Sequence, residues 1–130
     1  MSCNYTLKVC HVSSDFAADI DAINKEIESS GVLENLYEEA SLMKWYNGFL
    51  KLNANNKILI ANRETNSYEE YAETYGAFQK DSADIIAKYT TAGKLVFSQR
   101  YEDPTSDDQI LIVEPGSARE TTIAQYYKTL

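Results

Sequence analysis

The amino-acid sequence predicts an α+β fold, a two-layer sandwich in which helices lie mainly on one face of an antiparallel sheet of about six strands. Segments rich in alternating or β-forming residues are joined by short connections, which favours antiparallel pairing. Other segments carry apolar residues at helical spacing. The chain has 130 residues, of which 44% are hydrophobic. This length and composition suit one domain, expected to span 1–130, with a core of its own.

The first 40 residues predict a strand followed by two helices. Residues 5–12 alternate and contain β-forming side chains, so we expect a strand there. Asp15 is expected to cap the first helix, whose apolar residues recur at helical spacing until Gly31 ends it. Residues 33–40 suggest a second, short helix, and the sequence leaves open where that helix stops.

The pair Asn47-Gly48 stands between two apolar-rich runs and predicts a hairpin over 42–52. A two-residue turn would place four side chains on the core face, namely Met43, Trp45, Leu50 and Leu52. It would place four others on the opposite face, namely Lys44, Tyr46, Phe49 and Lys51. The alternative is a helix that continues through Tyr46. After a turn, residues 57–62 are expected to form a further strand.

Residues 67–89 predict the longest helix of the chain. Ser67 to Glu70 has the pattern of a capping box, and apolar residues then recur every three or four positions as far as Tyr89. Gly93 is expected to end this helix. Its opposite face would carry Glu69, Glu70, Glu73, Asp81 and Asp84.

The C-terminal third predicts two strands, over 94–102 and 109–113, joined by the loop 103–108. A second capping box at 117–120 is expected to open a short terminal helix.

The loop at 103–108 partly resembles a calcium-binding loop. The matching ligand positions are Asp103, Thr105, Asp107 and Glu114. Asp108 stands where such loops require glycine, and strands replace the flanking helices. We therefore expect a solvated acidic loop and no metal site.

Common catalytic motifs are absent from the sequence: it has no glycine-rich phosphate loop and no GxSxG, HExxH or CxxC pattern. Cys10 and His11 are adjacent on the predicted strand, so their side chains should point to opposite faces and not form a nucleophile–base pair. We assign no catalytic residue and expect no cofactor. A small enzyme is the class that we weight lowest.

A cytoplasmic location is expected from three sequence features. No run of residues is apolar enough to span a membrane, and the N-terminal residues do not resemble a secretory leader. Cys3 and Cys10 would lie more than about 20 Å apart on an extended segment, too far for a disulfide. Free thiols favour a reducing compartment.

The net charge of −8 arises from 20 acids and 12 bases. Such a chain repels nucleic acid and anionic membranes, so its charge disfavours direct binding to either. A basic segment, 44–63, has four basic residues and no acid, and acidic segments flank it.

The acidic helix faces suggest a noncatalytic protein-binding module, an inhibitor or immunity-type protein that occludes a basic site on a partner. If that site binds nucleic acid, the rows of acids would imitate a phosphate backbone. The expected contact residues are Asp15, Asp19, Glu26, Glu69, Glu70, Glu73, Asp81 and Asp84. The competing interpretation is that these acids are only the solvated side of amphipathic helices. Small acidic α+β domains without motifs are common among phage and plasmid inhibitors and immunity proteins, an analogy from composition alone.

The alternative function is a small domain that binds a ligand or nucleic acid through the basic and aromatic face of the hairpin 42–52. Its contact residues would be Lys44, Tyr46, Phe49 and Lys51. The ten tyrosines are also suited to a homo-oligomer interface.

Overall fold

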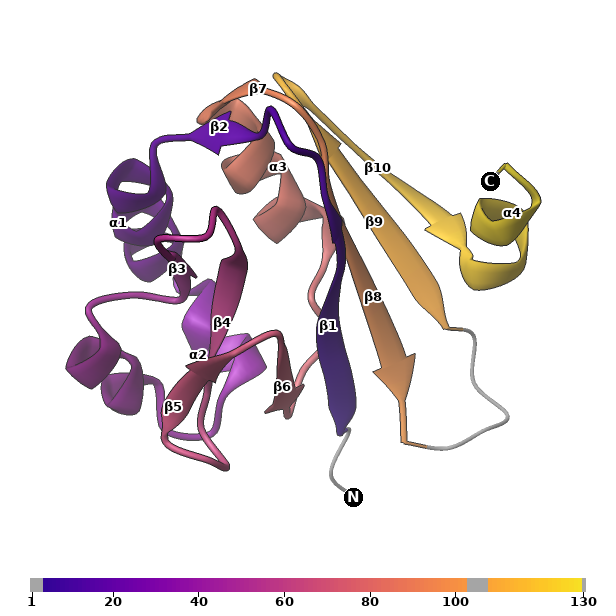
Figure 1. The fold of residues 1–130 in the computed structure, drawn as a ribbon. Coiled ribbons are helices and arrows are strands. Elements are labelled where there is room, and N and C mark those ends of the chain that lie inside the picture. Colours follow the sequence, from indigo (N-terminus) through magenta and orange to yellow (C-terminus); the bar gives the residue numbers. More distant parts are fainter. Residues whose placement is uncertain (1–3, 103–107, 130) are drawn as a thin grey trace.

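The main feature of the fold is a five-stranded antiparallel sheet, seen in a computed structural model that describes residues 4–102 and 108–129 (Figure 1). Across the sheet, the strands follow the order β10 (Ser117–Thr122), β9 (Gln109–Glu114), β8 (Leu95–Tyr101), β1 (Tyr5–Val12) and β6 (Tyr71–Thr74). Every neighbouring pair is antiparallel. The expected α+β class with an antiparallel main sheet is therefore confirmed, with five strands in that sheet where about six were expected.

Two smaller sheets and five helical segments complete the described fold. One small sheet has the order β3 (Leu50–Leu52), β4 (Ile58–Asn62) and β5 (Ser67–Glu69), and the other pairs β2 (Ala17–Ala18) with β7 (Thr90–Ala92). The helices are α1 (Ile20–Ser30), α2 (Val32–Leu36), the 3₁₀ helix η1 (Ala40–Tyr46), α3 (Lys80–Lys88) and α4 (Ile123–Lys128). The expected strands at 5–12, 57–62, 94–102 and 109–113 are confirmed, as is a short helix after Gly31.

The first helix begins later than the sequence suggested. Its N-cap is Asp19, whose carboxylate accepts a hydrogen bond from the backbone N–H of Ala22, so the expected cap at Asp15 is wrong. Asp15 lies in the preceding turn, where it accepts a hydrogen bond from the Ser13 hydroxyl. The expected end at Gly31 is confirmed, because this residue adopts the left-handed conformation (φ 79°) that ends many helices.

A β-bulge in β1 changes which side chains face the core. The register with β8 shifts between Val9 and His11, and the extra residue breaks the alternation of faces. Val9 and Val12 both pack against the core, whereas Cys10 and His11 are both exposed. The prediction that Cys10 and His11 lie on opposite faces is therefore wrong.

The predicted hairpin over 42–52 does not form. Residues 40–46 are a 3₁₀ helix, and Asn47 (φ 61°) is its C-cap rather than a hairpin turn residue. The short strand β3 pairs with β4 instead, with Leu50 opposite Ile60. The alternative of a helix through Tyr46 is the one that agrees with the structure.

The predicted long helix over 67–89 is also wrong in its first half. Residues 67–69 and 71–74 are the strands β5 and β6, and only 80–88 are helical. Both strands have a partner elsewhere in the chain, because β5 pairs with β4 and β6 pairs with β1. The capping box at 117–120 fails in the same way: these residues belong to β10, and the terminal helix begins after Thr122, which caps it.

The main core lies between the inner face of the main sheet, the sheet β3–β4–β5 and the helices α1, α2 and α3. Its largest fully buried side chains include Phe49, Phe78 and Phe97, whose rings contact one another in series. A second, smaller cluster lies on the other face of the main sheet, where α4 packs (Figure 1). The two-layer sandwich with helices mainly on one face stays a prediction.

Candidate partner-binding surface

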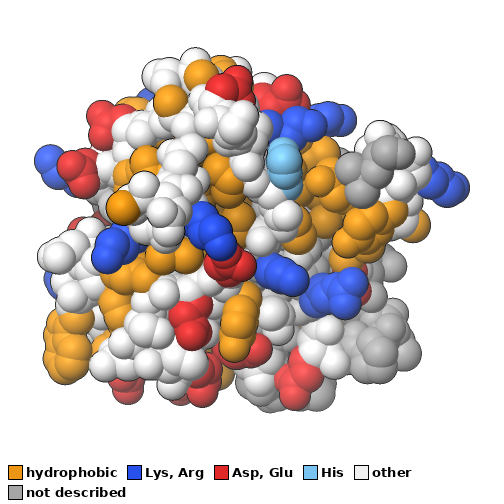
Figure 2. All heavy atoms as spheres, in the orientation of Figure 1, with side chains coloured by type: hydrophobic (Ala, Val, Ile, Leu, Met, Phe, Trp, Pro, Cys, Tyr) orange, Lys and Arg blue, Asp and Glu red, His pale blue; other side chains and the backbone are white. Residues whose placement is uncertain are grey.

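The most exposed of the large hydrophobic side chains in the described chain is Trp45 on η1, at 77% exposure. A tryptophan buries a large apolar area when it is covered, and its indole N–H is a hydrogen-bond donor. Trp45 is therefore the strongest single indication of a binding surface. In Figure 2, hydrophobic side chains (orange) reach the surface over the part of the chain that carries η1.

Internal contacts hold the segment that carries Trp45 in place. A 3₁₀ helix repeats every three residues, so Met43 and Tyr46 share the side of η1 that packs against the core. The Tyr68 hydroxyl donates to the backbone carbonyls of Tyr46 and Gly48, and burial raises the pKa of Tyr68 to about 12. The rings of Tyr46 and Tyr68 meet edge to face, 5.3 Å apart.

A second attachment comes from Asn24 on α1. Its Oδ1 accepts hydrogen bonds from the backbone N–H groups of Phe49 and Leu50, at 3.0 and 2.9 Å, and its Nδ2 donates to the Leu50 carbonyl at 3.0 Å. β3 is an edge strand, so the Asn24 amide pairs with both backbone groups of Leu50 as a neighbouring strand would. Trp45 therefore protrudes next to a backbone segment, 46–50, that hydrogen bonds from Tyr68 and Asn24 hold in place.

A groove of about 580 Å³ lies beside Trp45, between η1, β3 and the start of α1. Asp19 and Asp21 contribute acidic groups, Leu52 is partly exposed, and Lys51 lies over the ring of Tyr68 at 5.4 Å. The groove therefore combines an aromatic anchor with carboxylates.

The acidic groups of this side come from one stretch of chain. Residues 13–39 contain eight acids and one lysine. Three of the expected contact residues lie in this stretch: Asp15, Asp19 and Glu26. Asp19 lines the groove, and Asp15 is exposed in the turn that precedes β2.

Glu26 has a structural contact that the sequence did not indicate. Its carboxylate accepts hydrogen bonds from the Lys88 ammonium and the Tyr89 hydroxyl, each at 2.7 Å, and so joins α1 to the end of α3. The hydrogen bond from Lys88, followed by that from Tyr89, holds the pKa of Glu26 below its usual value. Glu26 is therefore partly neutralised within the molecule and is a weak candidate for partner contact.

This arrangement predicts a pH-dependent contribution of Glu26 to stability. Because its pKa is lower in the folded chain than in the unfolded chain, the contribution is present above the unfolded pKa, near 4.5, and is lost as pH falls through the folded value. In urea unfolding, we expect Glu26→Gln to be destabilised relative to wild type at pH 7 and to differ less from it at pH 3. Glu28→Gln is the matched control, because Glu28 is exposed on the same helix. An equal effect of Glu26→Gln at both pH values would contradict the prediction.

The other five expected contact residues do not form a helix face. Glu69 lies on β5, where its carboxylate accepts hydrogen bonds from Asn62 and Thr65. Glu70 follows β5 and forms an ion pair with Lys57, and Glu73 lies on β6, where it accepts a hydrogen bond from Thr6. On α3, Asp84 forms an ion pair with Lys80, and Asp81 is exposed in the first turn. Three of these acids lie on or between strands, so the predicted row of acids along one helix is wrong.

The alternative binding surface is also altered by the structure. Phe49 is 1% exposed and packs in the core, so the predicted face of four side chains does not exist. Lys44 and Lys51 are exposed, and Tyr46 is half-buried. On the opposite predicted face, Met43 and Leu50 are buried as expected, whereas Trp45 and Leu52 are exposed.

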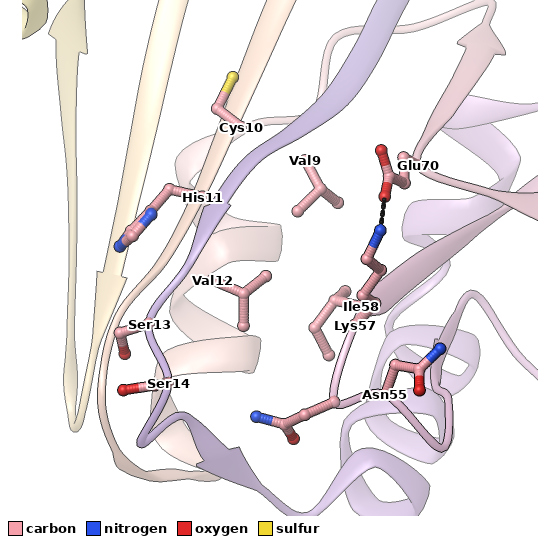
Figure 3. A pocket seen from close by; sticks show the side chains of 11 residues that line it. Val9, Cys10, His11, Val12, Ser13, Ser14, Asn55, Lys57, Ile58 and Glu70 are labelled. Carbon is pink, nitrogen blue, oxygen red and sulfur yellow. Dashed lines mark hydrogen bonds and ion pairs between the residues drawn. The ribbon is translucent and has the colours of Figure 1, made fainter.

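A separate pocket of about 420 Å³ lies between β1 and the start of β4 (Figure 3). Val9, Val12 and Ile58 point into it, and the ion pair of Lys57 and Glu70, 3.1 Å, stands at its edge.

Cys10 and His11 lie on the other side of β1 from Val9 and Val12, where the thiol and the imidazole diverge (Figure 3). The bulge thus puts both side chains on one side of the strand without bringing them together as a nucleophile and a base.

The described residues, 4–102 and 108–129, contain no cluster of three or more His, Cys, Asp or Glu side chains that could hold a metal ion. Of the residues compared above with a calcium loop, Asp103, Thr105 and Asp107 lie outside the described residues. In the same described portion of the chain, none of the helices has the length and apolar character needed to cross a membrane.

No protein-family model, no curated protein and no solved structure matches this chain. The surfaces described above are therefore the basis for assigning a function.

Proposed function

We propose that this protein is a noncatalytic protein-binding module that contacts a basic surface of a partner through Trp45 and the acidic start of α1. The exposure of Trp45 is the observation that carries the proposal. Tryptophan is among the residues that dominate binding energy at protein interfaces. A side chain carried by an ordered backbone also loses less conformational entropy on binding than one on a flexible loop.

Charge supports the kind of partner. Asp19 and Asp21 line the groove beside Trp45, and carboxylates at an interface speed association with a basic protein and exclude acidic ones. A partner bound here would have its basic surface covered, which is how an inhibitor or immunity-type protein acts. The acids do not form a row along one long helix. Only their net charge therefore supports the idea that this protein imitates a nucleic-acid backbone.

The test is a comparison of variants in affinity capture from a lysate of the native host, with quantitative mass spectrometry of the retained proteins. We expect a basic protein to be retained at low salt and released at high salt. Trp45→Ala should weaken binding of that protein about 30-fold or more, as expected for a central aromatic contact.

Two matched controls make the comparison specific. Tyr71→Ala removes an aromatic side chain that is 45% exposed on β6, and it should leave binding unchanged. Asp21→Lys should weaken binding, whereas Asp81→Lys should not, although both acids occupy the second position of their helices. We leave Asp19 unsubstituted in this test, because it caps α1 and its loss would also affect the stability of that helix. Equal retention by Trp45→Ala and wild type would rule out the proposed surface.

A further inference from the structure

The outer face of the main sheet, which faces away from the main core, is only partly covered. The side chains of Val96, Ile110 and Ile112 form a small apolar cluster there, and Ile123 and Tyr126 of α4 pack on it. The helix has six residues and contacts β9 and β10. Beyond its cover, Lys8 and Cys10 of β1 and Arg100 of β8 are exposed.

A cavity of about 350 Å³ lies where the cover of α4 ends. One wall is apolar and is made by Ile110, Ile123 and the ring of Tyr127, a residue that is 58% exposed. The opposite wall carries Lys8 of β1 and Arg100 of β8. In Figure 2, basic side chains (blue) lie beside a hydrophobic patch (orange) over β1, β8 and α4.

The register of the sheet brings the two basic side chains together. Lys8 is opposite Ser98 and Thr6 is opposite Arg100, so Lys8 and Arg100 are diagonal neighbours on one face, with backbone positions about 7–8 Å apart. Like charges at this spacing repel each other. A bound anion would remove this repulsion and could contact both groups.

The polar groups that line the cavity are hydrogen-bond donors. They are the Lys8 ammonium, the Arg100 guanidinium, the hydroxyls of Thr6, Ser98 and Tyr127, and the Cys10 thiol; none of the lining residues is acidic. Among the described residues, Lys8 has no ion-pair partner, and Arg100 has a loose one, Asp108, at 3.9 Å.

Ser98 lies on the buried side of this lining, at 6% exposure, and contributes a hydroxyl to it. Thr6 donates to Glu73 of the neighbouring strand at 3.2 Å, at the rim. The Ser98 hydroxyl would be a further hydrogen-bond donor to a ligand oxygen in the cavity.

We propose that this cavity binds a small phosphorylated molecule with a planar ring, of the size of a nucleoside monophosphate. Lys8 and Arg100 would hold the phosphate, which accepts hydrogen bonds from several donors at once. The ring would pack on Tyr127 and Ile123, as bases stack on aromatic side chains. The volume is within the range of small-molecule sites, and it is small for a longer strand. This site is separate from the Trp45 surface and does not depend on the function proposed above.

The test is an NMR titration of the ¹⁵N-labelled protein with AMP, with adenosine and inorganic phosphate titrated separately. We expect AMP to bind more tightly than either fragment and to shift the amide signals of Ser98, Ile110 and Ile123. Lys8→Ala and Tyr127→Ala should each weaken AMP binding about tenfold. The matched control Lys25→Ala, which removes a lysine that is exposed on α1, should leave it unchanged.

The Cys10 thiol gives a second measurement, because it lines the cavity. In a Cys3→Ser background, saturating AMP should slow alkylation of Cys10 several-fold. AMP binding that is no tighter than that of phosphate, or that is unaffected by Lys8→Ala, would overturn the proposal. Binding of a single-stranded oligonucleotide without binding of AMP would also overturn it and would assign the face to an extended strand instead.

Discussion

Replacing Asn24 with alanine should lower the free energy of unfolding by about 3 kcal/mol, because it leaves the backbone N–H groups of Phe49 and Leu50 and the Leu50 carbonyl without partners. Each unpaired group in a partly buried site costs on the order of 1 kcal/mol. Urea unfolding measures the loss. Hydrogen exchange should show faster exchange of the Phe49 and Leu50 amides in particular.

The same substitution should affect the proposed binding surface indirectly. Without the Asn24 amide, the segment that follows Trp45 loses its attachment to α1, and more conformational entropy would be lost on binding. Lys25→Ala is the control, because Lys25 is the next residue of α1 and is exposed. A change in unfolding free energy for Asn24→Ala within 0.5 kcal/mol of that for Lys25→Ala, roughly the range of ordinary surface substitutions, would contradict the assigned role.

Replacing Gly76 with alanine should destabilise the protein by about 3 kcal/mol or more, through overlap between backbone segments. A Cβ at this position would overlap the backbone carbonyl of Asn35, at the end of α2. The adjacent hydrogen bond from Tyr75 N–H to the Leu36 carbonyl, 2.7 Å, holds the two segments together. The clash is with backbone, so a change of side-chain rotamer cannot relieve it. Thermal and urea unfolding measure the effect.

Gly116→Ala is the matched control for this prediction. A Cβ at Gly116 meets no atom within 4 Å, and only the left-handed backbone (φ 72°) opposes it, at a cost of about 1 kcal/mol. The ratio of the two losses therefore separates steric overlap from backbone strain. A Gly76 variant as stable as the Gly116 variant would show that α2 and the segment before α3 are not closely packed.

Elements with a strong pattern and a clear boundary could be predicted from the sequence. The apolar spacing of α1 and the glycine at its end are local features, and both are confirmed. The strands β1, β4, β8 and β9 were also found, because β-branched residues with short connections favour antiparallel pairing. The bulge at Cys10 could not be predicted, because it depends on the register with β8.

The two largest errors have one physical cause. Residues 67–74 carry tyrosines and glutamates at a spacing that suits a helix, and Asn47-Gly48 suits a hairpin. In the folded chain, β6 pairs with the edge of β1, and β5 pairs with the edge of β4. The Asn24 amide occupies the free edge of β3, the side on which a hairpin partner would have paired. Long-range pairing thus outweighed local preference.

The candidate site shows the same division. The acids of α1 were found from charge alone, because solvated carboxylates need no long-range contact. Trp45 was assigned to the core, because an apolar residue in a predicted hairpin is expected to face inward. The alternative helix through Tyr46 was the one sequence feature that could have indicated the exposure of Trp45. In a helix, residues two positions apart point to different sides, so Trp45 would not share the core-facing side of Met43.

The sequence by itself determined the α+β class, the negative charge and the concentration of acids before residue 40, since these follow from composition and local pattern. Only the tertiary structure decided which aromatic side chains are exposed. Burial depends on which distant segments pack over a residue: Phe49 stacks on Phe78 and is buried, whereas Trp45 is 77% exposed. The neighbours that bring Lys8 and Arg100 together are likewise set by strand register, which connects residues more than 90 positions apart along the chain.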